Sequence, residues 1–255
     1  MILLILLLAQ PASAVDPAVT LEPAVREKCL AVLKAGLRSD EFWPAMHAAE
    51  ALTYAGEKAL VIQELNAKAA TDDQQRCGLA RESIRAGVRD LAGILLAILD
   101  DPKSIGRVHA AESLFKVAEI GDGQALRAAA AQEADLKLKL MAAAALARLG
   151  DKDSLALIRK CVLHRDRETR KVAVWILGQI GEPSDVPAIR EALKNEDDEL
   201  ARAYCANALA CLGDQAGLEL LQKNLSSGNP VVRTYAADFA GHAKAIQTHG
   251  RLIEL

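Results

Sequence analysis

Apolar residues recur along this chain in a phrase that returns about every 31 residues. Each copy places small residues, mostly alanine, before one large apolar anchor, and usually glycine and an acidic residue after it. The anchors are Leu52, Ile84, Leu114, Leu146, Leu177, Leu209 and, in a weaker copy, Phe239. They lie 32, 30, 32, 31, 32 and 30 residues apart. This period is typical of stacked structural repeats, in which each unit contacts only its neighbours.

The clearest repeat shows how one unit is built. Residues 168–180 are predicted as a first helix, which the following Gly181 and Pro183 end because glycine favours a helix C-terminus and proline cannot continue the helix. Asp185 is a candidate N-cap for a shorter second helix over residues 187–194. Neither helix can bury its apolar face alone, so the pairs must stack, and each buried anchor contributes about 1.5–3 kcal/mol.

The pattern therefore predicts an all-α protein, an α-solenoid of stacked antiparallel helix pairs. Hydrophobic residues make up 51% of the chain, much of it the strong helix formers Ala and Leu, and no alternating strand pattern extends for long. The predicted organisation is a signal peptide over residues 1–14, a leader with an N-terminal capping helix over 15–40, the repeats over 41–243, and a C-terminal cap or tail over 244–255.

These repeats resemble HEAT repeats, specifically the short, alanine-rich subtype named after phycobilisome lyases. The resemblance is carried by the turn at residues 181–189 and by the phrases ending at Leu52, Leu114, Leu146, Leu177 and Leu209. It covers residues 41–243 and implies an α-α superhelix with a concave face that commonly binds proteins. A phycobilin lyase of this type would need a bilin pocket, but Trp43 and Trp175, the two Trp residues, lie about four units apart.

A second resemblance is to the di-iron deoxyhypusine hydroxylase, which looks like a HEAT stack with adjacent His-Glu dyads in successive units. His47 and His109 stand where the histidines of that family would be. Each is followed by alanine, Ala48 and Ala110, in place of glutamate. The family motif is therefore broken at its ligand position.

Two His–Glu pairs remain the sharpest candidates for chemistry. His47 with Glu50, and His109 with Glu112, are each spaced i, i+3 and so share a helix face, where they could hold part of a metal site. The pairs lie two units apart, on the order of 20 Å at ordinary helix packing distances, and the unit between supplies Glu82 but no His. The alternative is an ordinary His–Glu contact at a helix interface. The sequence therefore predicts no catalytic, cofactor-binding or metal-binding residues.

A column of basic residues is the second candidate. Four of them lie seven residues before their anchors, namely Arg107, Lys139, Arg170 and Arg202, with Arg233 one position out of register. The column is either a stripe for an anionic partner or a ladder of ion pairs with the acids of adjacent turns. Candidate acids for the ladder are Asp122, Asp151, Glu182 and Asp214.

The acidic turns and the cysteines are weaker candidates for a functional site. The acids at residues 72–73, 100–101 and 196–198 are predicted as N-caps and first-turn residues rather than as a calcium loop. The five cysteines are odd in number and match no metal or redox spacing, which favours a role as small core residues.

The N-terminus predicts export. Residues 2–9 are an apolar run, and Ala12-Ser13-Ala14 is an A-x-A cleavage site, although no Lys or Arg precedes the run. We expect a periplasmic or extracellular protein with no membrane insertion after signal removal. The net charge of −3 and the lack of basic runs argue against nucleic acid, so the expected partner is another protein.

The sequence contains the residues of a repeat stack and no visible nucleophile with a partner. The favoured hypothesis is a non-catalytic protein-interaction scaffold or binding module, not an enzyme, that needs no cofactor. The alternative is a metal-dependent, lyase-like or hydroxylase-like HEAT-repeat enzyme using His47/Glu50 or His109/Glu112.

Overall fold

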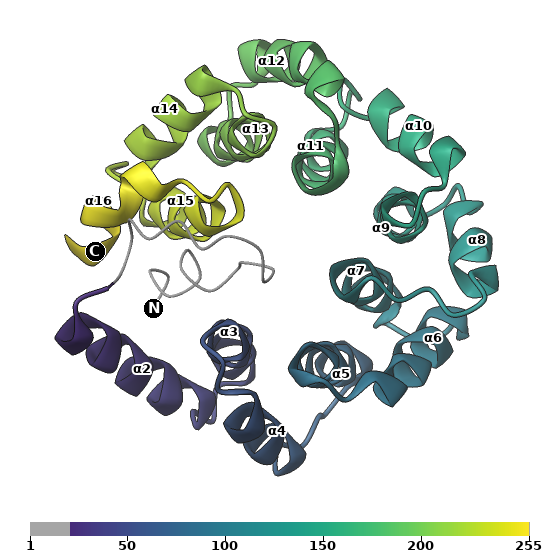
Figure 1. Ribbon diagram of the computed structural model, residues 1–255. Coiled ribbons are helices and arrows are strands. Elements are labelled where there is room, and N and C mark those ends of the chain that lie inside the picture. Colours follow the sequence, from purple (N-terminus) through teal and green to yellow (C-terminus); the bar gives the residue numbers. More distant parts are fainter. Residues whose placement is uncertain (1–20, 255) are drawn as a thin grey trace. The chain divides into compact units, whose positions relative to one another are not determined.

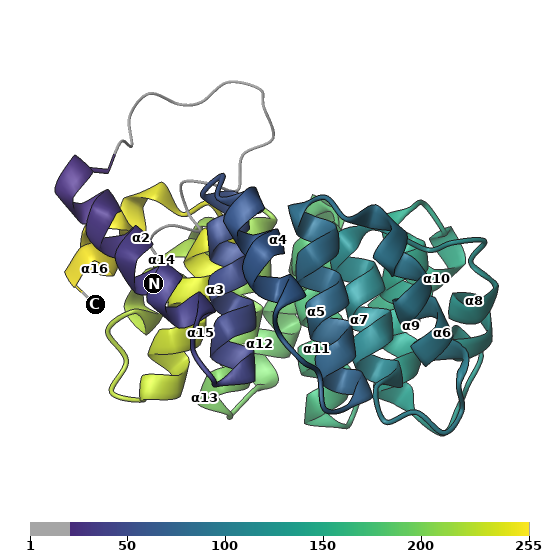
Figure 2. The same ribbon diagram turned by 90° about the horizontal axis from the view of Figure 1, so that it is seen from below.

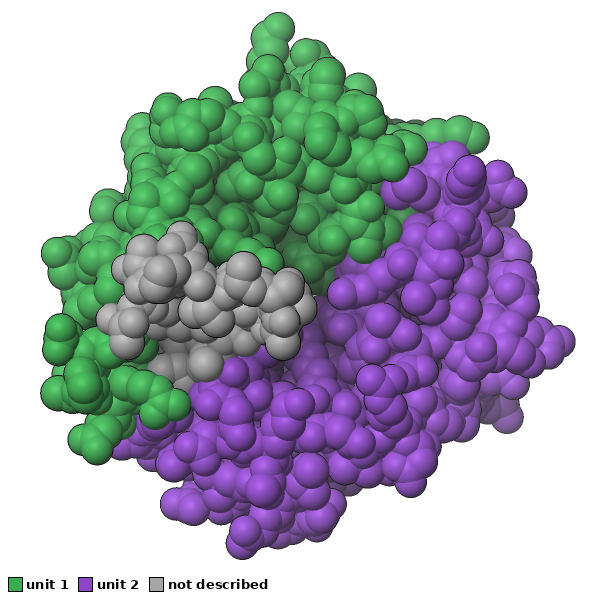
Figure 3. Space-filling view, viewed as in Figure 1, with its two compact units in different colours: residues 1–29, 158–255 green, residues 30–157 purple. Residues whose placement is uncertain are grey.

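The computed structural model describes residues 21–254, and over that range the chain forms helices and turns without a strand (Figures 1 and 2). The predicted all-α fold of stacked helix pairs is confirmed. The predicted signal peptide, residues 1–14, lies outside the described residues. Two compact units divide the chain: unit 2 is residues 30–157, and unit 1 is residues 1–29 with 158–255 (Figure 3). None of the described helices combines the length and the apolar character needed to cross a bilayer.

Unit 2 is built from helix pairs that follow α2 (Pro23–Leu37). The first helices of the pairs are α3 (Phe42–Tyr54), α5 (Asp73–Ala86), α7 (Arg107–Val117) and α9 (Leu136–Arg148). The second helices are α4 (Lys58–Asn66), α6 (Ala92–Asp100, after the 3-10 turn η1, Arg89–Leu91) and α8 (Gln124–Ala130). The second helix after α9, α10 (Lys152–Lys160), crosses the boundary between the two units. Successive first helices pack side by side as one layer, and the second helices α4, α6 and α8 cover it (Figure 1).

Unit 1 repeats the same plan. Its first helices are α11 (Arg167–Ile180), α13 (Glu199–Cys211) and α15 (Pro230–His242). Its second helices are α12 (Val186–Asn195, after η2, Pro183–Asp185), α14 (Gln215–Asn224) and the short α16 (His249–Glu254, after η3, Ile246–Thr248). Helix α13 packs between α11 and α15, with α12 and α14 against it.

The repeat phrase explains why the first helices pack so closely. Leu52, Leu114 and Leu177 are all fully buried, and the alanines that precede them are buried as well. Turns between the two helices of a pair use glycine where the backbone is left-handed, as at Gly150 (φ 101°) and Gly213 (φ 82°). Small side chains and glycine turns together let each pair fold back and stack on the next.

Helix N-termini follow the prediction at some acids and not at others. The side chains of Asp72 and Asp198 accept hydrogen bonds from main-chain N–H groups three residues on, as N-caps do. Asp185 does not cap α12 in this way. Its carboxylate instead accepts the main-chain N–H of Glu182 at 2.9 Å and two hydrogen bonds from Arg159, because the 3-10 turn η2 precedes the helix.

Aromatic side chains are confined to one layer of the fold. The three Phe, three Tyr and two Trp residues of the chain all lie on first helices. They are Phe42, Trp43 and Tyr54 on α3, Phe115 on α7, Trp175 on α11, Tyr204 on α13, and Tyr235 and Phe239 on α15. The second helices are covered by aliphatic and charged residues, so any aromatic ring that meets a ligand must come from the first-helix layer.

The buried anchors give a direct test of the stacking. Leu177→Asp places an unpaired charge at a position that is 0% exposed and should lower the free energy of unfolding by about 4 kcal/mol. Leu163→Asp makes the same change at a side chain that is 55% exposed and should leave stability within about 0.5 kcal/mol. Urea denaturation followed by circular dichroism measures both. Equal stability of the two variants would show that Leu177 does not lie between repeats.

Candidate functional site

Polar side chains on three successive first helices of unit 2 form one continuous set, which we call the polar face. It comprises Trp43, His47, Glu50 and Tyr54 on α3; Arg81, Glu82 and Arg85 on α5; and His109, Glu112 and Lys116 on α7. On α3 and α7 these residues are spaced three or four apart, so they share one side of the helix; on α5, Arg81 and Glu82 are adjacent and Arg85 lies one turn further on. Because α5 packs against both α3 and α7, the three sets lie next to one another.

Glu50 is joined to the neighbouring repeat by an ion pair. Its carboxylate lies 2.6 Å from Nη1 of Arg85, and the same guanidinium nitrogen lies 3.0 Å from Oε2 of Glu82. Glu82 is 0% exposed and also accepts a 2.6 Å hydrogen bond from Nε of Arg81. Two carboxylates and two guanidinium groups therefore balance one another at the α3–α5 interface.

Electrostatics in this network follow from burial and pairing. Burial alone would lower the pKa of Arg85, but the carboxylates of Glu82 and Glu50 raise it above its usual range. Burial raises the pKa of Tyr54, at the end of the same α3 face, with Arg85 acting against that shift. Arg85 is thus a permanent cation, and Tyr54 keeps its proton.

The second predicted pair, His109 and Glu112, lies on α7. Glu112 binds Nζ of Lys116 at 2.7 Å. Burial opposes the ionisation of Glu112, yet Lys116, Arg81 and His109 hold its pKa at about 2. Burial lowers the pKa of His109, which Glu112 partly offsets, and Nδ1 of its ring is buried without a hydrogen-bond partner among the described residues. A largely neutral imidazole therefore sits beside a carboxylate anion.

Trp43 joins the two ends of the polar face. Its indole stacks on the imidazole of His109 with ring centroids 5.9 Å apart and an interplanar angle of 27°. Phe42 meets the indole edge-on at 5.1 Å. The two His–Glu pairs were expected to be about two repeats apart, and the side chain of Trp43 spans that separation.

The donor set does not fit a metal ion. No group of three or more His, Cys, Asp or Glu side chains among residues 21–254 is placed to hold one. The carboxylates of Glu50, Glu82 and Glu112 are each engaged by a cationic side chain. Ala48 and Ala110, which stand in place of the dyad glutamates, are fully buried, so they belong to the alanine packing between helices. As arranged among residues 21–254, the polar face presents carboxylates paired with cations and not a set of converging metal ligands.

Sequence reasoning missed most of the polar face. It singled out the two His–Glu pairs, weighed Trp43 only for a bilin pocket, and did not identify Arg81, Arg85 or Lys116. A register signal was present, since Glu50, Glu82 and Glu112 each lie two residues before an anchor in three consecutive repeats. The ion pairs and the Trp–His stack depend on side-chain reach between helices, which spacing along the chain does not give.

The basic column matches the ion-pair expectation in part, with other acids than those named: Arg170 binds Glu196 at 2.6 Å, and Lys139 binds Glu133 at 2.5 Å. It also holds the turns between repeats. Arg170, Arg202 and Arg233 donate to main-chain carbonyl oxygens of the turn before their own helix, and Arg107 donates to the carbonyl of Leu99 at 2.9 Å. The turn acids Glu182 and Asp214 pair instead with arginines of second helices, Arg159 and Arg190. The column therefore holds turns between repeats, as basic side chains do at helix C-termini.

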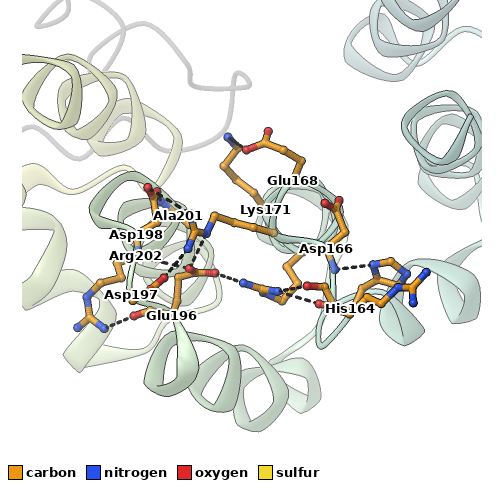
Figure 4. Close-up of polar contacts among 12 residues, drawn as sticks. His164, Asp166, Glu168, Lys171, Glu196, Asp197, Asp198, Ala201 and Arg202 are labelled. Atoms are coloured by element: carbon orange, nitrogen blue, oxygen red, sulfur yellow. Dashed lines mark hydrogen bonds and ion pairs between the residues drawn. The ribbon is translucent and has the colours of Figure 1, made fainter.

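The acidic turn before α13 illustrates this role (Figure 4). Glu196 is nearly buried and binds Nε of Arg167 at 3.0 Å and Nη2 of Arg170 at 2.6 Å. Burial opposes the charge of Glu196, but the hydrogen bond from Arg170 holds its pKa below the usual range. Asp198 caps α13. These acids tie α11 to the next repeat, which fits the predicted capping function and not a calcium loop.

The buried thiols of Cys77 and Cys205 are poor nucleophiles. Burial raises the pKa of Cys77 and Cys205 to about 12, so both stay protonated at neutral pH. This agrees with the expectation that they serve as small core residues.

Comparison with known proteins identifies the repeats. Residues 123–210 match the family of HEAT repeats, which confirms the resemblance predicted for the repeat phrases. Two curated relatives match in sequence, both named deoxyhypusine hydroxylase. The protein from Chaetomium globosum is 36% identical over 124 residues, 47% of this chain and 33% of its own length. The protein from Neurospora crassa is 37% identical over 101 residues, 39% of this chain and 28% of its own length.

Two solved structures are similar in fold at low identity. Human deoxyhypusine hydroxylase in complex with glycerol gives a TM-score of 0.40 at 16% identity, covering 89% of this chain and 98% of that one. The complex of CpcE and CpcF of phycocyanin lyase from Nostoc sp. gives 0.49 at 19% identity, covering 97% and 99%.

The prediction of a non-catalytic scaffold, and with it the prediction that the chain is not an enzyme, is wrong. The curated relatives at 36% and 37% identity are named as a hydroxylase, which is an enzyme. The matched segments span about a third of those relatives' lengths. The scaffold hypothesis rested on the broken His-Glu dyads and on the lack of a nucleophile with a visible partner in the sequence.

Breaking the ion network of Glu50, Glu82, Arg81 and Arg85 should lower the free energy of unfolding substantially. Arg85→Met leaves the buried carboxylate of Glu82 with one cation fewer and should lower the free energy of unfolding by about 3 kcal/mol. Adding Glu82→Gln removes the excess charge and should restore part of the loss. Thermal or urea denaturation measures both variants. A double variant less stable than the single one would contradict the proposed balance of charges.

The lowered pKa of His109 predicts that the stability of the fold changes with pH. Its pKa in the folded chain lies below the unfolded value of about 6.5, so the unfolded state binds more protons as the pH falls. The contribution of His109 to stability should therefore fall as the pH drops below about 6.5 and be constant above it. In His109→Gln this part of the pH dependence should be absent, whereas His47→Gln, at an exposed position, serves as the control. Melting temperatures between about pH 5 and 8 measure it.

Proposed function

We propose that this chain is a HEAT-repeat enzyme related to deoxyhypusine hydroxylase, with the polar face of α3, α5 and α7 as its reacting surface. The observation that carries the proposal is the join between the two His–Glu pairs: Trp43 stacks on His109 at 5.9 Å, and Arg85 links Glu50 to Glu82. The names of the curated relatives support the enzyme class.

His109 is the group suited to accept a proton. Its lowered pKa keeps the imidazole largely neutral near pH 7. Because Nδ1 is buried, the proposal assigns the reaction to Nε2. Glu112 stabilises the imidazolium that forms, because its charge raises the pKa of His109. A base and a nearby anion of this kind contribute about 10²–10⁴-fold to proton-transfer steps in enzymes.

Cationic side chains bind the acids of the polar face. Lys116 helps to hold the pKa of Glu112 at about 2, so Glu112 does not serve as a proton donor near neutral pH. Arg85 and Arg81 bind the carboxylate of Glu82. Trp43, which is 37% exposed, supplies an apolar surface beside them. The face therefore combines one neutral base, fixed charges and one indole.

Hydroxylation of deoxyhypusine is the activity to test. The assay supplies deoxyhypusine in a peptide, dioxygen and a reductant, with and without added ferrous iron, and mass spectrometry detects the gain of one oxygen atom. His109→Ala should lower kcat by about 100-fold. His164→Ala, which removes a histidine outside the polar face, is the matched control and should retain the wild-type rate. A wild-type chain that adds no oxygen under any of these conditions would overturn the proposal.

A further inference from the structure

One contact in unit 2 reaches past the nearest neighbour. In repeat stacks each unit contacts only the units beside it. Trp43 lies on α3 and His109 on α7, with α5 of the intervening repeat between them, yet their rings stack at 5.9 Å. Something in α5 must leave room for a large side chain to cross it.

Gly78 provides that room. A Cβ atom at this position would lie 3.1 Å from Cε1 of Phe42 and 3.3 Å from Cζ3 of Trp43, so even alanine would press on both rings. Glycine inside a helix is unfavourable relative to alanine, and Gly78 lies well inside α5 (Asp73–Ala86). The absence of a side chain is what lets Trp43 lie over α5 and reach α7.

Stacking against the indole of Trp43 holds the imidazole ring of His109. A functional histidine is usually oriented by a hydrogen bond to one ring nitrogen. Here Nδ1 of His109 is buried and accepts or donates none among the described residues. The indole of Trp43, itself braced edge-on by Phe42, is the flat surface against the ring.

We propose that Trp43 is the positioning residue of His109 and that Gly78 makes this contact possible. The inference rests on the proposed function in taking His109 as the reacting base, but the contact itself is testable without activity. Trp43 acts through the orientation of the imidazole.

Several charged groups also face His109 and must be held constant in any test. They are Glu112 and Lys116 on its own helix, Arg81 on α5 and Lys137 on α9. The variants below leave all four in place, so a changed titration of His109 reports the loss of the indole and not of a charge.

Fluorescence reads the contact directly. Trp175→Phe leaves Trp43 as the single Trp of the chain. A protonated imidazole in contact with indole quenches its emission, so Trp43 fluorescence should fall as the pH drops from about 7 to about 5. The fall should be absent in Trp175→Phe/His109→Gln. Emission that does not depend on His109 would overturn the inference.

Two glycine variants separate positioning from helix propensity. Gly78→Ala, in the Trp175→Phe background, should weaken the pH-dependent quenching because the methyl group displaces the two rings. Gly93→Ala, in α6, has nothing within 4 Å of the added Cβ and should leave the quenching unchanged. Circular dichroism confirms that each variant is helical. Equal quenching in both variants would contradict the role of Gly78.

Steady-state kinetics test whether the orientation of His109 by Trp43 affects the rate of the proposed reaction. Trp43→Leu should lower kcat about tenfold with KM unchanged, and Trp43→Phe should restore part of the rate, because a ring still flanks the imidazole. Trp43→Leu alters a partly exposed residue, so folding is not at risk as it is for Gly78→Ala. Quenching in a chain without hydroxylase activity overturns only the proposed function. Full kcat in Trp43→Leu overturns the positioning.

Discussion

Close packing of alanine-rich first helices is the constraint on which the rest of this structure depends. Anchors such as Leu52, Leu114 and Leu177 are fully buried because the residues before them are small enough for the next helix to approach. The same constraint decides what the polar face can contain. Ala48 and Ala110 lie in the packed layer, so a carboxylate at either position would be buried between helices. The acids that do occur, Glu50 and Glu112, stand further along the helix and are matched by cations.

Most of the fold followed from the sequence because helix pairing depends on local spacing. The period, the anchors and the first helix over residues 168–180 were predicted, and the structure has α11 at Arg167–Ile180. Asp185 does stand directly before α12, but its carboxylate accepts hydrogen bonds from Glu182, just before the 3-10 turn, and from Arg159 instead of capping the helix, and the glycine and proline pattern does not reveal that turn. The predicted export signal lies outside the described residues and stays a prediction.

The candidate site was predicted only in part. His109 and Glu112 were identified from their spacing, but the partners that set their ionisation, Lys116 and Arg81, were not. A long side chain such as that of Lys116 or Arg81 can reach several neighbouring groups. Which of them it binds depends on which helix faces it and on how deeply each possible partner is buried. The broken dyads likewise favoured a scaffold, since a motif search weighs adjacent residues and not a register shared by three helices. The enzyme relatives corrected that hypothesis.

Confinement of every aromatic ring to the first-helix layer has a spectroscopic consequence. Near-ultraviolet absorbance and intrinsic emission come from aromatic side chains, and here those belong to α3, α7, α11, α13 and α15. Far-ultraviolet dichroism, by contrast, weighs both layers by their peptide bonds. Near-ultraviolet signals therefore report only on the first helix of each pair, whereas far-ultraviolet dichroism reports on both helices. Unfolding of the second helices alone would lower the far-ultraviolet signal and leave the near-ultraviolet signal unchanged.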